Sequence, residues 1–420
     1  MIRFAAATSL ILAAATPATA QSPEETAQAA LDNAPVWDGH NDVPIQLRGR
    51  FGNVIGDFDF EDTSATGPEH SEGRTMHTDL ARLAQGQVGA QFWSVYVSAA
   101  LSEPEAVQAT IEQIDVTKRL IARYPQRLGL SLTARDVERQ VADGRIAGML
   151  GIEGGHSIGS SLAVLRQMYA IGARYMTLTH SKNTPWADSA TDTPEHDGLT
   201  DFGKDLVREM NRIGMLVDLS HVSEKTMHDA LAVARKPGIC SHSGARAING
   251  HARNVPDSVL SRLARNGGIV MVVALPGFLN EDARQWYANR QAQKARLEAL
   301  WQGQPGEVER RLEAWDEANP LPLASISDMA DHIDHIREQA GTANIGIGGD
   351  YDGMSTGPVG MEDVTGYPAL FTELARRGYS QADLEAISFG NMMRVMRAAE
   401  AISAQMDDVP PFEYPAGEQR

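Results

Sequence analysis

Short apolar runs alternate with amphipathic stretches along most of the chain. Eight runs have the length and the continuous hydrophobicity of parallel strands that are buried on both faces. They cover residues 36–40, 88–98, 145–152, 173–179, 214–219, 237–241, 267–275 and 344–349. Stretches with helical periodicity lie between them, as at residues 103–123, 161–171, 200–213 and 224–234. The alternation predicts an α/β fold of the (β/α)8 TIM-barrel type, in a single domain over residues 21–420.

The alternative α/β architecture is an open, doubly wound sheet that binds a dinucleotide. Its main sequence signal is a Gly-x-Gly-x-x-Gly motif directly after the first strand. No such motif follows the run at residues 36–40. The closed barrel is therefore favoured.

Two segments interrupt the alternation. Residues 48–80 are rich in Gly, Asp, Ser and Thr, which is typical of a long loop. Residues 279–320 are strongly charged and helical in pattern, and they predict a helical insertion between the seventh and eighth strands. We interpret the insertion as a pair of solvated surface helices, with a lid over the barrel mouth or a contact in a homodimer as the alternatives.

The two ends of the chain differ from the rest in composition. Arg3, the apolar residues 4–15 and the sequence Ala18-Thr19-Ala20 predict a cleaved signal peptide over residues 1–20. The protein is therefore predicted to be periplasmic or secreted. No later run reaches 18 uncharged apolar residues, so no membrane anchor is expected after cleavage. Residues 407–420, which are rich in proline and acids, predict a loosely held tail.

Charge and cysteine content narrow the possible partners. The formal net charge of −18 argues against nucleic acid and anionic membranes. Cys240 is the only cysteine, so the chain cannot form an intrachain disulfide. The apolar surroundings of Cys240 predict a small buried residue rather than a nucleophile.

Ionisable residues occur at the ends of six of the eight predicted strands. The set is His40, Asp42, Glu153, His180, His221, His242 and Asp350. In a barrel, the carboxyl ends of all strands meet at one face, where catalytic groups gather. Burying so many ionisable groups together is costly unless metal binding or mutual pairing compensates. The pattern therefore predicts a metal site at the barrel mouth.

The number of ligands favours two metal ions. One zinc ion needs about three protein ligands and a water molecule, and His40, Asp42, Glu153, His221 and His242 exceed that number. Glu153 lies among glycines and has two oxygens, so it is the natural bridge. A water molecule between two ions becomes a hydroxide near neutral pH, which suits hydrolysis. Such ligands would also accept manganese or cobalt.

Several stretches resemble the membrane dipeptidase (renal dipeptidase) family of zinc peptidases, within the amidohydrolase-type barrels. They are DGHND at 38–42, EGGHS at 153–157, ARYMTLTHSKNTPWADS at 173–189, NRIGMLVDLSHVS at 211–223, SHSGAR at 241–246, RNVPD at 253–257 and GGDYDG at 348–353. The resemblance implies two zinc ions per chain. His40 and Asp42 would hold one ion, His221 and His242 would hold the other, and Glu153 would bridge them.

The resemblance also implies roles for three further residues. His180 would polarise the scissile carbonyl and stabilise the oxyanion. Arg253 would bind the free carboxylate of the substrate. Asp350 would take a proton from the attacking water and pass it to the leaving amine.

These features predict a zinc-dependent dipeptidase that cleaves dipeptides by a metal-bridging hydroxide. The resemblance implies that dipeptides with a C-terminal D-residue, as released in cell-wall turnover, are among its substrates. One alternative is another binuclear amidohydrolase that acts on N-acyl amino acids, lactams or lactones. The other is a non-catalytic periplasmic binding protein, against which the full set of ligands argues.

Overall fold

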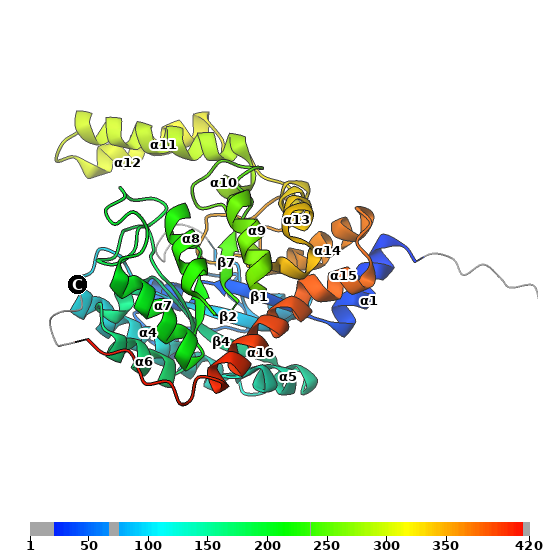
Figure 1. Ribbon diagram of the computed structural model, residues 1–420. Helices are drawn as coiled ribbons and strands as arrows, with labels where there is room; N and C mark the ends of the chain where they lie inside the picture. The colour runs from blue at the N-terminus through cyan, green and yellow to red at the C-terminus, as the bar shows by residue number, and fades with distance from the viewer. Residues whose placement is uncertain (1–20, 67–74, 236, 415–420) are drawn as a thin grey trace, which may run out of the picture.

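The computed structural model describes residues 21–66, 75–235 and 237–414 (Figure 1). The predicted signal peptide and the last six residues of the predicted tail lie outside these ranges. Among the helices within them, none combines the length and the apolar character that crossing a membrane requires.

The described strands are all parallel and form one sheet, most of which closes into a barrel. The barrel strands, in spatial order, are β2 (Val88–Tyr96), β1 (Val36–Asn41), β9 (Ile345–Ile347), β8 (Ile269–Val272), β7 (Ile239–Ser243), β6 (Leu216–Asp218), β5 (Ala173–Thr177) and β4 (Ile146–Glu153). Pairing of β2 with β4 closes the ring. The eight predicted strands and the TIM-barrel fold are confirmed. A ninth strand, β3 (Leu128–Leu130), was not predicted, and it pairs with the start of β4.

Helices surround the barrel and connect its strands (Figure 1). They are α1 (Pro23–Asn33), α2 (Val43–Phe51), α3 (Leu80–Gln85), α4 (Glu103–Arg123), α5 (Ala134–Ala142), α6 (Leu162–Ala170), α7 (Asp201–Ile213), α8 (Glu224–Val233), α9 (Asp257–Asn266), α10 (Pro276–Leu279), α11 (Glu281–Leu300), α12 (Pro305–Ala318), α13 (Ile326–Ala340), α14 (Tyr367–Arg376), α15 (Gln381–Glu385) and α16 (Asn391–Ala404). Local sequence explains the ends of several helices. The Ser223 side chain accepts the Thr226 N–H at the start of α8, and α7 is followed by Gly214, which has a φ of 93°.

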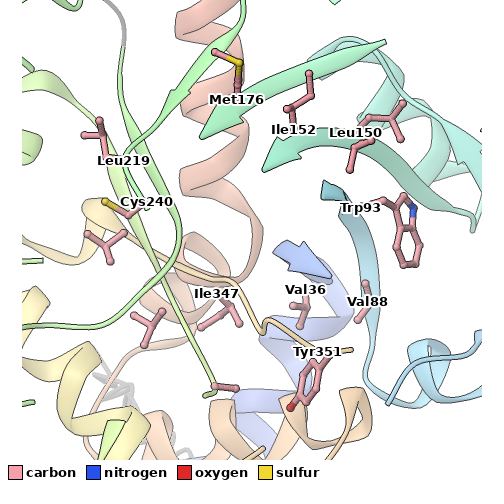
Figure 2. Packing of buried hydrophobic residues seen from close by; sticks show 14 of the residues in the cluster. Val36, Val88, Trp93, Leu150, Ile152, Met176, Leu219, Cys240, Ile347 and Tyr351 are labelled. Carbon is pink, nitrogen blue, oxygen red and sulfur yellow. The ribbon is translucent and has the colours of Figure 1, made fainter. Parts of the chain in front are cut away.

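The hydrophobic core has two main parts. Residues that point out of the barrel, such as Leu150, Met176 and Ile347, pack under the helices (Figure 2). Cys240 belongs to this layer, which confirms that it is a small buried residue. Aromatic and methionine side chains, among them Tyr175, form the second part together with residues of α16.

One buried carboxylate joins the first barrel strand to the last. Asp38 of β1 accepts hydrogen bonds from the Gly349 N–H (2.8 Å) and from the Tyr367 hydroxyl (2.7 Å). It also accepts the N–H of His40 (3.1 Å). Asp38 therefore fixes the end of β1 against the segment that follows β9.

The charged segment between β8 and β9 forms a helical hairpin, α11 and α12, beyond α10 at one end of the molecule (Figure 1). Arg290 and Asp316 pair across it, with a nearest distance of 2.8 Å. Most of its side chains are exposed, as expected for solvated surface helices. Its first turns contact the loop after β9, where the Tyr287 hydroxyl lies 3.0 Å from the Ser355 hydroxyl.

Two other segments differ in part from the sequence-based expectation. The predicted loop at 48–80 begins later than expected because α2 continues to Phe51, and residues 67–74 lie outside the described ranges. The described part of the predicted loose tail is bonded to α7. The Phe412 N–H donates to Glu209, and the Tyr414 hydroxyl donates to Asp205.

Candidate metal centre

The seven ionisable residues predicted at strand ends lie together at one mouth of the barrel. The strands position them in a regular way, because His180, His221 and Asp350 each follow the last residue of a strand by three positions. Six of the seven line a cavity of about 310 Å³; they are Asp42, Glu153, His180, His221, His242 and Asp350. His40 does not line the cavity and is fully buried.

The Glu153 carboxylate occupies the middle of the cluster. Its Oε1 lies 2.9 Å from Nε2 of His221 and 3.4 Å from Nε2 of His242. Its Oε2 lies 3.5 Å from Nε2 of His40 and accepts a hydrogen bond from the Ser94 hydroxyl (3.1 Å). The two oxygens therefore face different ligand groups, which is the arrangement that a bridging carboxylate requires.

The side chains that could hold a cation form three overlapping groups within the described ranges. The groups are His40–Glu153–His242, Glu153–His180–His221 and His40–Asp42–Asp350. In each group, one ligand atom per residue lies within 4.8 Å of the others. The five predicted ligands all occur in these groups, together with His180 and Asp350.

Buried atoms without hydrogen-bond partners indicate whether a cation fits this cluster. Nε2 of His40 and Oδ1 of Asp42 are buried without a hydrogen-bond partner, although Nε2 lies 3.4 Å from the other oxygen of Asp42. Leaving such atoms unpaired in a protein interior is costly. Imidazole nitrogens and carboxylate oxygens are ligands that zinc and similar divalent ions accept. The residues present therefore fit a divalent metal centre.

Backbone conformation and a glycine shape the mouth. His221 and Asp350 have positive φ values of 66° and 63°, a conformation that costs a non-glycine residue free energy and is concentrated at functional sites. Gly353 leaves room for two carboxylates, because a Cβ atom there would lie 2.1 Å from Oδ2 of Asp42 and 2.6 Å from Oδ1 of Asp350.

Burial dominates the electrostatics of the cluster. It lowers the pKa of His180 to about 4, so the His180 ring is neutral at pH 7. It raises the pKa of Asp350 well above the usual range, and the nearby carboxylates of Asp42 and Glu153 add to that rise. Burial alone would also raise the pKa of Glu153, but the surrounding histidines hold it well below its ordinary value.

Arg253 lies in the wall of the same cavity. Its guanidinium carbon is 5.3 Å from the centre of the Phe278 ring. Its terminal nitrogens make long hydrogen bonds of 3.4 Å, to the Ser243 hydroxyl and to the His242 carbonyl. Burial lowers the pKa of Arg253 to about 10, so it remains a cation at neutral pH.

Sequence reasoning missed several residues of the site. Tyr96 and Ser94 lie near the end of β2. The Tyr96 ring is tilted against the His180 ring with centroids 4.6 Å apart, and the Ser94 hydroxyl donates to Glu153. Both residues lie inside the run predicted at residues 88–98, so a search for polar groups at strand ends does not find them. Tyr175, whose hydroxyl lies 2.9 Å from Nδ1 of His40, was missed for the same reason.

Comparisons with known proteins identify the family of the chain. The profile of the family described as "Membrane dipeptidase (Peptidase family M19)" matches residues 24–409. Dipeptidase 3 of Macaca fascicularis is 40% identical over 399 residues, which cover 93% of this chain and 71% of that protein. Dipeptidase 3 of Homo sapiens is 38% identical over 399 residues, with the same shares of both chains.

Solved structures share the fold. The probable dipeptidase PvdM from Pseudomonas aeruginosa superposes with a TM-score of 0.76 at 23% identity, over 90% of this chain and 99% of that chain. A metallopeptidase from Rhodobacter sphaeroides, liganded with a phosphinate mimic of the dipeptide L-Ala-D-Ala, superposes with a TM-score of 0.71 at 23% identity, over 87% and 99% of the two chains. The resemblance drawn from the sequence is therefore confirmed. The chain belongs to the membrane dipeptidase family, peptidase family M19, and is a metallo-dipeptidase that hydrolyses peptide bonds.

Proposed function

We propose that this protein is a dizinc dipeptidase whose substrates include dipeptides with a C-terminal D-residue. The observation that carries the proposal is the position of Glu153, whose two oxygens face His221 and His242 on one side and His40 on the other. His40 and Asp42 would hold one ion, and His221 and His242 would hold the second. Bound divalent cations would lower the pKa of a water molecule and polarise the peptide carbonyl.

Arg253 would anchor the substrate by its free C-terminal carboxylate. A guanidinium group can form two parallel hydrogen bonds with a carboxylate, which fixes orientation as well as position. The long 3.4 Å bonds that Arg253 now makes leave its donors poorly used. A carboxylate in the cavity would use them better, and this favours substrates that end in a free acid.

His180 and Asp350 would act on the scissile bond from opposite strands. The His180 ring stacks on His221 with centroids 4.2 Å apart and points Nε2 into the cluster, 3.6 Å from Glu153. Its ring N–H would donate to the oxygen of the scissile carbonyl as negative charge develops there. Asp350 would accept the proton of the attacking water and deliver it to the leaving amine.

The ligand of a structural relative supports including dipeptides with a C-terminal D-residue among the substrates. The Rhodobacter sphaeroides metallopeptidase was solved with a mimic of L-Ala-D-Ala. We infer the same class of substrate here, together with export to the periplasm directed by residues 1–20, where peptides released from the cell wall would be available.

The experiment that tests the proposal measures metal content and dipeptide hydrolysis together. Two zinc ions and cleavage of a glycyl dipeptide in the wild type, both lost in Glu153→Ala, are the expected results. Cleavage of L-L but not L-D dipeptides by the zinc-loaded enzyme would overturn the proposal that dipeptides with a C-terminal D-residue are substrates. Two metal ions without dipeptide cleavage would move the substrate to N-acyl amino acids or lactams.

A further inference from the structure

A chain of buried polar groups lies behind His242, on the side of its ring that faces away from Glu153. Nδ1 of His242 is 2.8 Å from the Ser241 hydroxyl, which is 2.6 Å from Oδ2 of Asp218. Asp218 and Ser241 are fully buried, and His242 is 1% exposed. The chain connects neighbouring barrel strands, because Asp218 ends β6 while Ser241 and His242 belong to β7.

Counting hydrogens fixes the direction of each bond in this chain. Oδ1 of Asp218 accepts the backbone N–H groups of Ser220 (3.0 Å) and Ser241 (2.9 Å). Oδ2 accepts the hydroxyls of Thr177 (2.5 Å) and Ser241 (2.6 Å). A carboxylate that receives four donors acts only as an acceptor. The single hydroxyl hydrogen of Ser241 is therefore directed at Asp218.

The same count determines where the proton of the His242 ring lies. Because the Ser241 hydroxyl has given its hydrogen to Asp218, it can only accept from Nδ1 of His242. Nδ1 must then carry the ring hydrogen, and Nε2 keeps a free lone pair. Nε2 faces Oε1 of Glu153 at 3.4 Å and Nε2 of His221 at 3.0 Å. These are the atoms that would share a cation.

We infer that Asp218 and Ser241 are positioning residues that hold His242 in the Nδ1–H tautomer, with Nε2 ready to bind a metal ion. The inference rests on the proposed role of His242 as a ligand. Partners of this kind fix the ring orientation and the tautomer of metal-binding histidines, and their loss typically lowers metal affinity by about 10–100-fold.

Ser241→Ala and Thr177→Val form a matched pair for testing this inference. Each removes one hydroxyl donor from the same oxygen of Asp218, but only Ser241 contacts His242. We expect Ser241→Ala to weaken one of the two zinc sites by about 10–100-fold in a titration of the metal-free protein. Thr177→Val should change that affinity by less than about twofold, although both variants lose stability.

Asp218→Asn provides a stronger test because it should reverse the chain. The amide oxygen would continue to accept from the two backbone N–H groups, because such groups can only donate. Its NH2 group would then donate to the Ser241 hydroxyl, which would donate in turn to Nδ1 of His242. The ring hydrogen would move to Nε2 and block the ligand atom. We expect a loss of zinc affinity at least as large as in Ser241→Ala.

Long-range 1H–15N spectra of the histidine rings read the tautomer directly in the metal-free protein. The His242 signal, assigned by its loss in His242→Ala, should show the Nδ1–H form in the wild type and in Thr177→Val. It should show the Nε2–H form in Asp218→Asn. An unchanged tautomer and unchanged zinc affinity in folded Ser241→Ala would overturn the inference, as would an equal loss of affinity in Thr177→Val. Fewer than two zinc ions in the wild type would instead count against the proposed function, because the spectra test the tautomer without metal.

Discussion

The two halves of the proposed metal centre would share Glu153, but they differ in charge and burial. The half at β1 contains an imidazole and a carboxylate, His40 and Asp42, whose side chains are 0% and 5% exposed. The half at β6 and β7 contains two imidazoles, His221 and His242, which are 12% and 2% exposed. The positive charge of Arg253 also acts on the second half, where it adds to burial in lowering the pKa of His221. Similar ligand numbers therefore need not give equal affinities, and we expect the β1 half to bind its cation more tightly.

The largest loss of metal binding and activity should come from substitution of Glu153, which the two halves share. Glu153→Gln keeps the shape of the side chain but removes its charge, so both cations should be lost together with activity. Metal analysis after dialysis and a dipeptide assay measure this. Ser94→Ala, which removes a hydrogen bond to Oε2 of Glu153 but no charge, is the control and should retain both ions. A Glu153→Gln protein that keeps one tightly bound ion would show that the halves are independent.

Removing the carboxylate of Asp42 should abolish the difference in metal affinity between the two halves. Asp42→Asn takes one negative charge from the β1 half. A unit charge at about 4 Å with an effective dielectric constant of 20 is worth about 4 kcal/mol, or roughly 10³-fold in affinity. Zinc titration of the metal-free variant should show two weak sites. A tight site that survives in Asp42→Asn would mean that the carboxylate is not the source of the difference.

Substitution of His180 should affect catalysis without affecting metal binding. The ring contacts the second half through His221 and Glu153, but its proposed role concerns the substrate. His180→Ala should lower kcat by roughly 10²–10³-fold, as expected for the loss of one oxyanion donor, while the metal content stays at two. Loss of one metal ion from this variant would instead identify His180 as a ligand.

In the wild type, the two cations should leave in separate steps. Dialysis against increasing chelator concentrations should remove the ion of the β6–β7 half first, with affinities that differ by at least about tenfold because of the unequal charge. Release of both ions in a single step would contradict the expected difference in metal affinity between the two halves.

The smallest expected change in zinc affinity should come from substitution of Arg253. Arg253→Met removes a buried positive charge near the second half, so the weaker cation should bind several-fold more tightly. The KM for dipeptides should rise at the same time, because the carboxylate of the substrate loses its partner. Zinc titration and steady-state kinetics on the same sample measure both changes. Weaker zinc binding in the variant would show that Arg253 supports the site through packing rather than opposing it through charge.

The sequence was sufficient to place the charged residues of the site because of a general property of barrels. The carboxyl ends of parallel strands converge, so Glu153, His221 and Asp350 could be brought together from their positions after apolar runs. Strand β3, Leu128–Leu130, was missed although β6 and β9 are equally short, because only those two lie within longer predicted runs, at residues 214–219 and 344–349.

The hydrogen-bond partners of the predicted ligands could not be predicted from the sequence in the same way. Ser241 and Asp218 occur in the motifs that contain His242 and His221, but nothing in those motifs shows that the two side chains meet. Their contact depends on the register between β6 and β7, where Asp218 pairs with Ile239. It also depends on which face of its strand each of the two side chains occupies. Hydrogen-bond direction is therefore a property of the folded barrel.

The carboxylate of Asp38 has a consequence for the order in which this protein folds. Its partners, Gly349 and Tyr367, lie 311 and 329 residues further along the chain. The same link fixes the backbone of His40 beside the segment that carries Asp350. Contacts between such distant residues form late, because closing a long loop costs entropy before any contact repays it. The metal centre is therefore expected to be completed in the last step of folding, so the cation would stabilise the closed barrel without guiding the earlier strands into place.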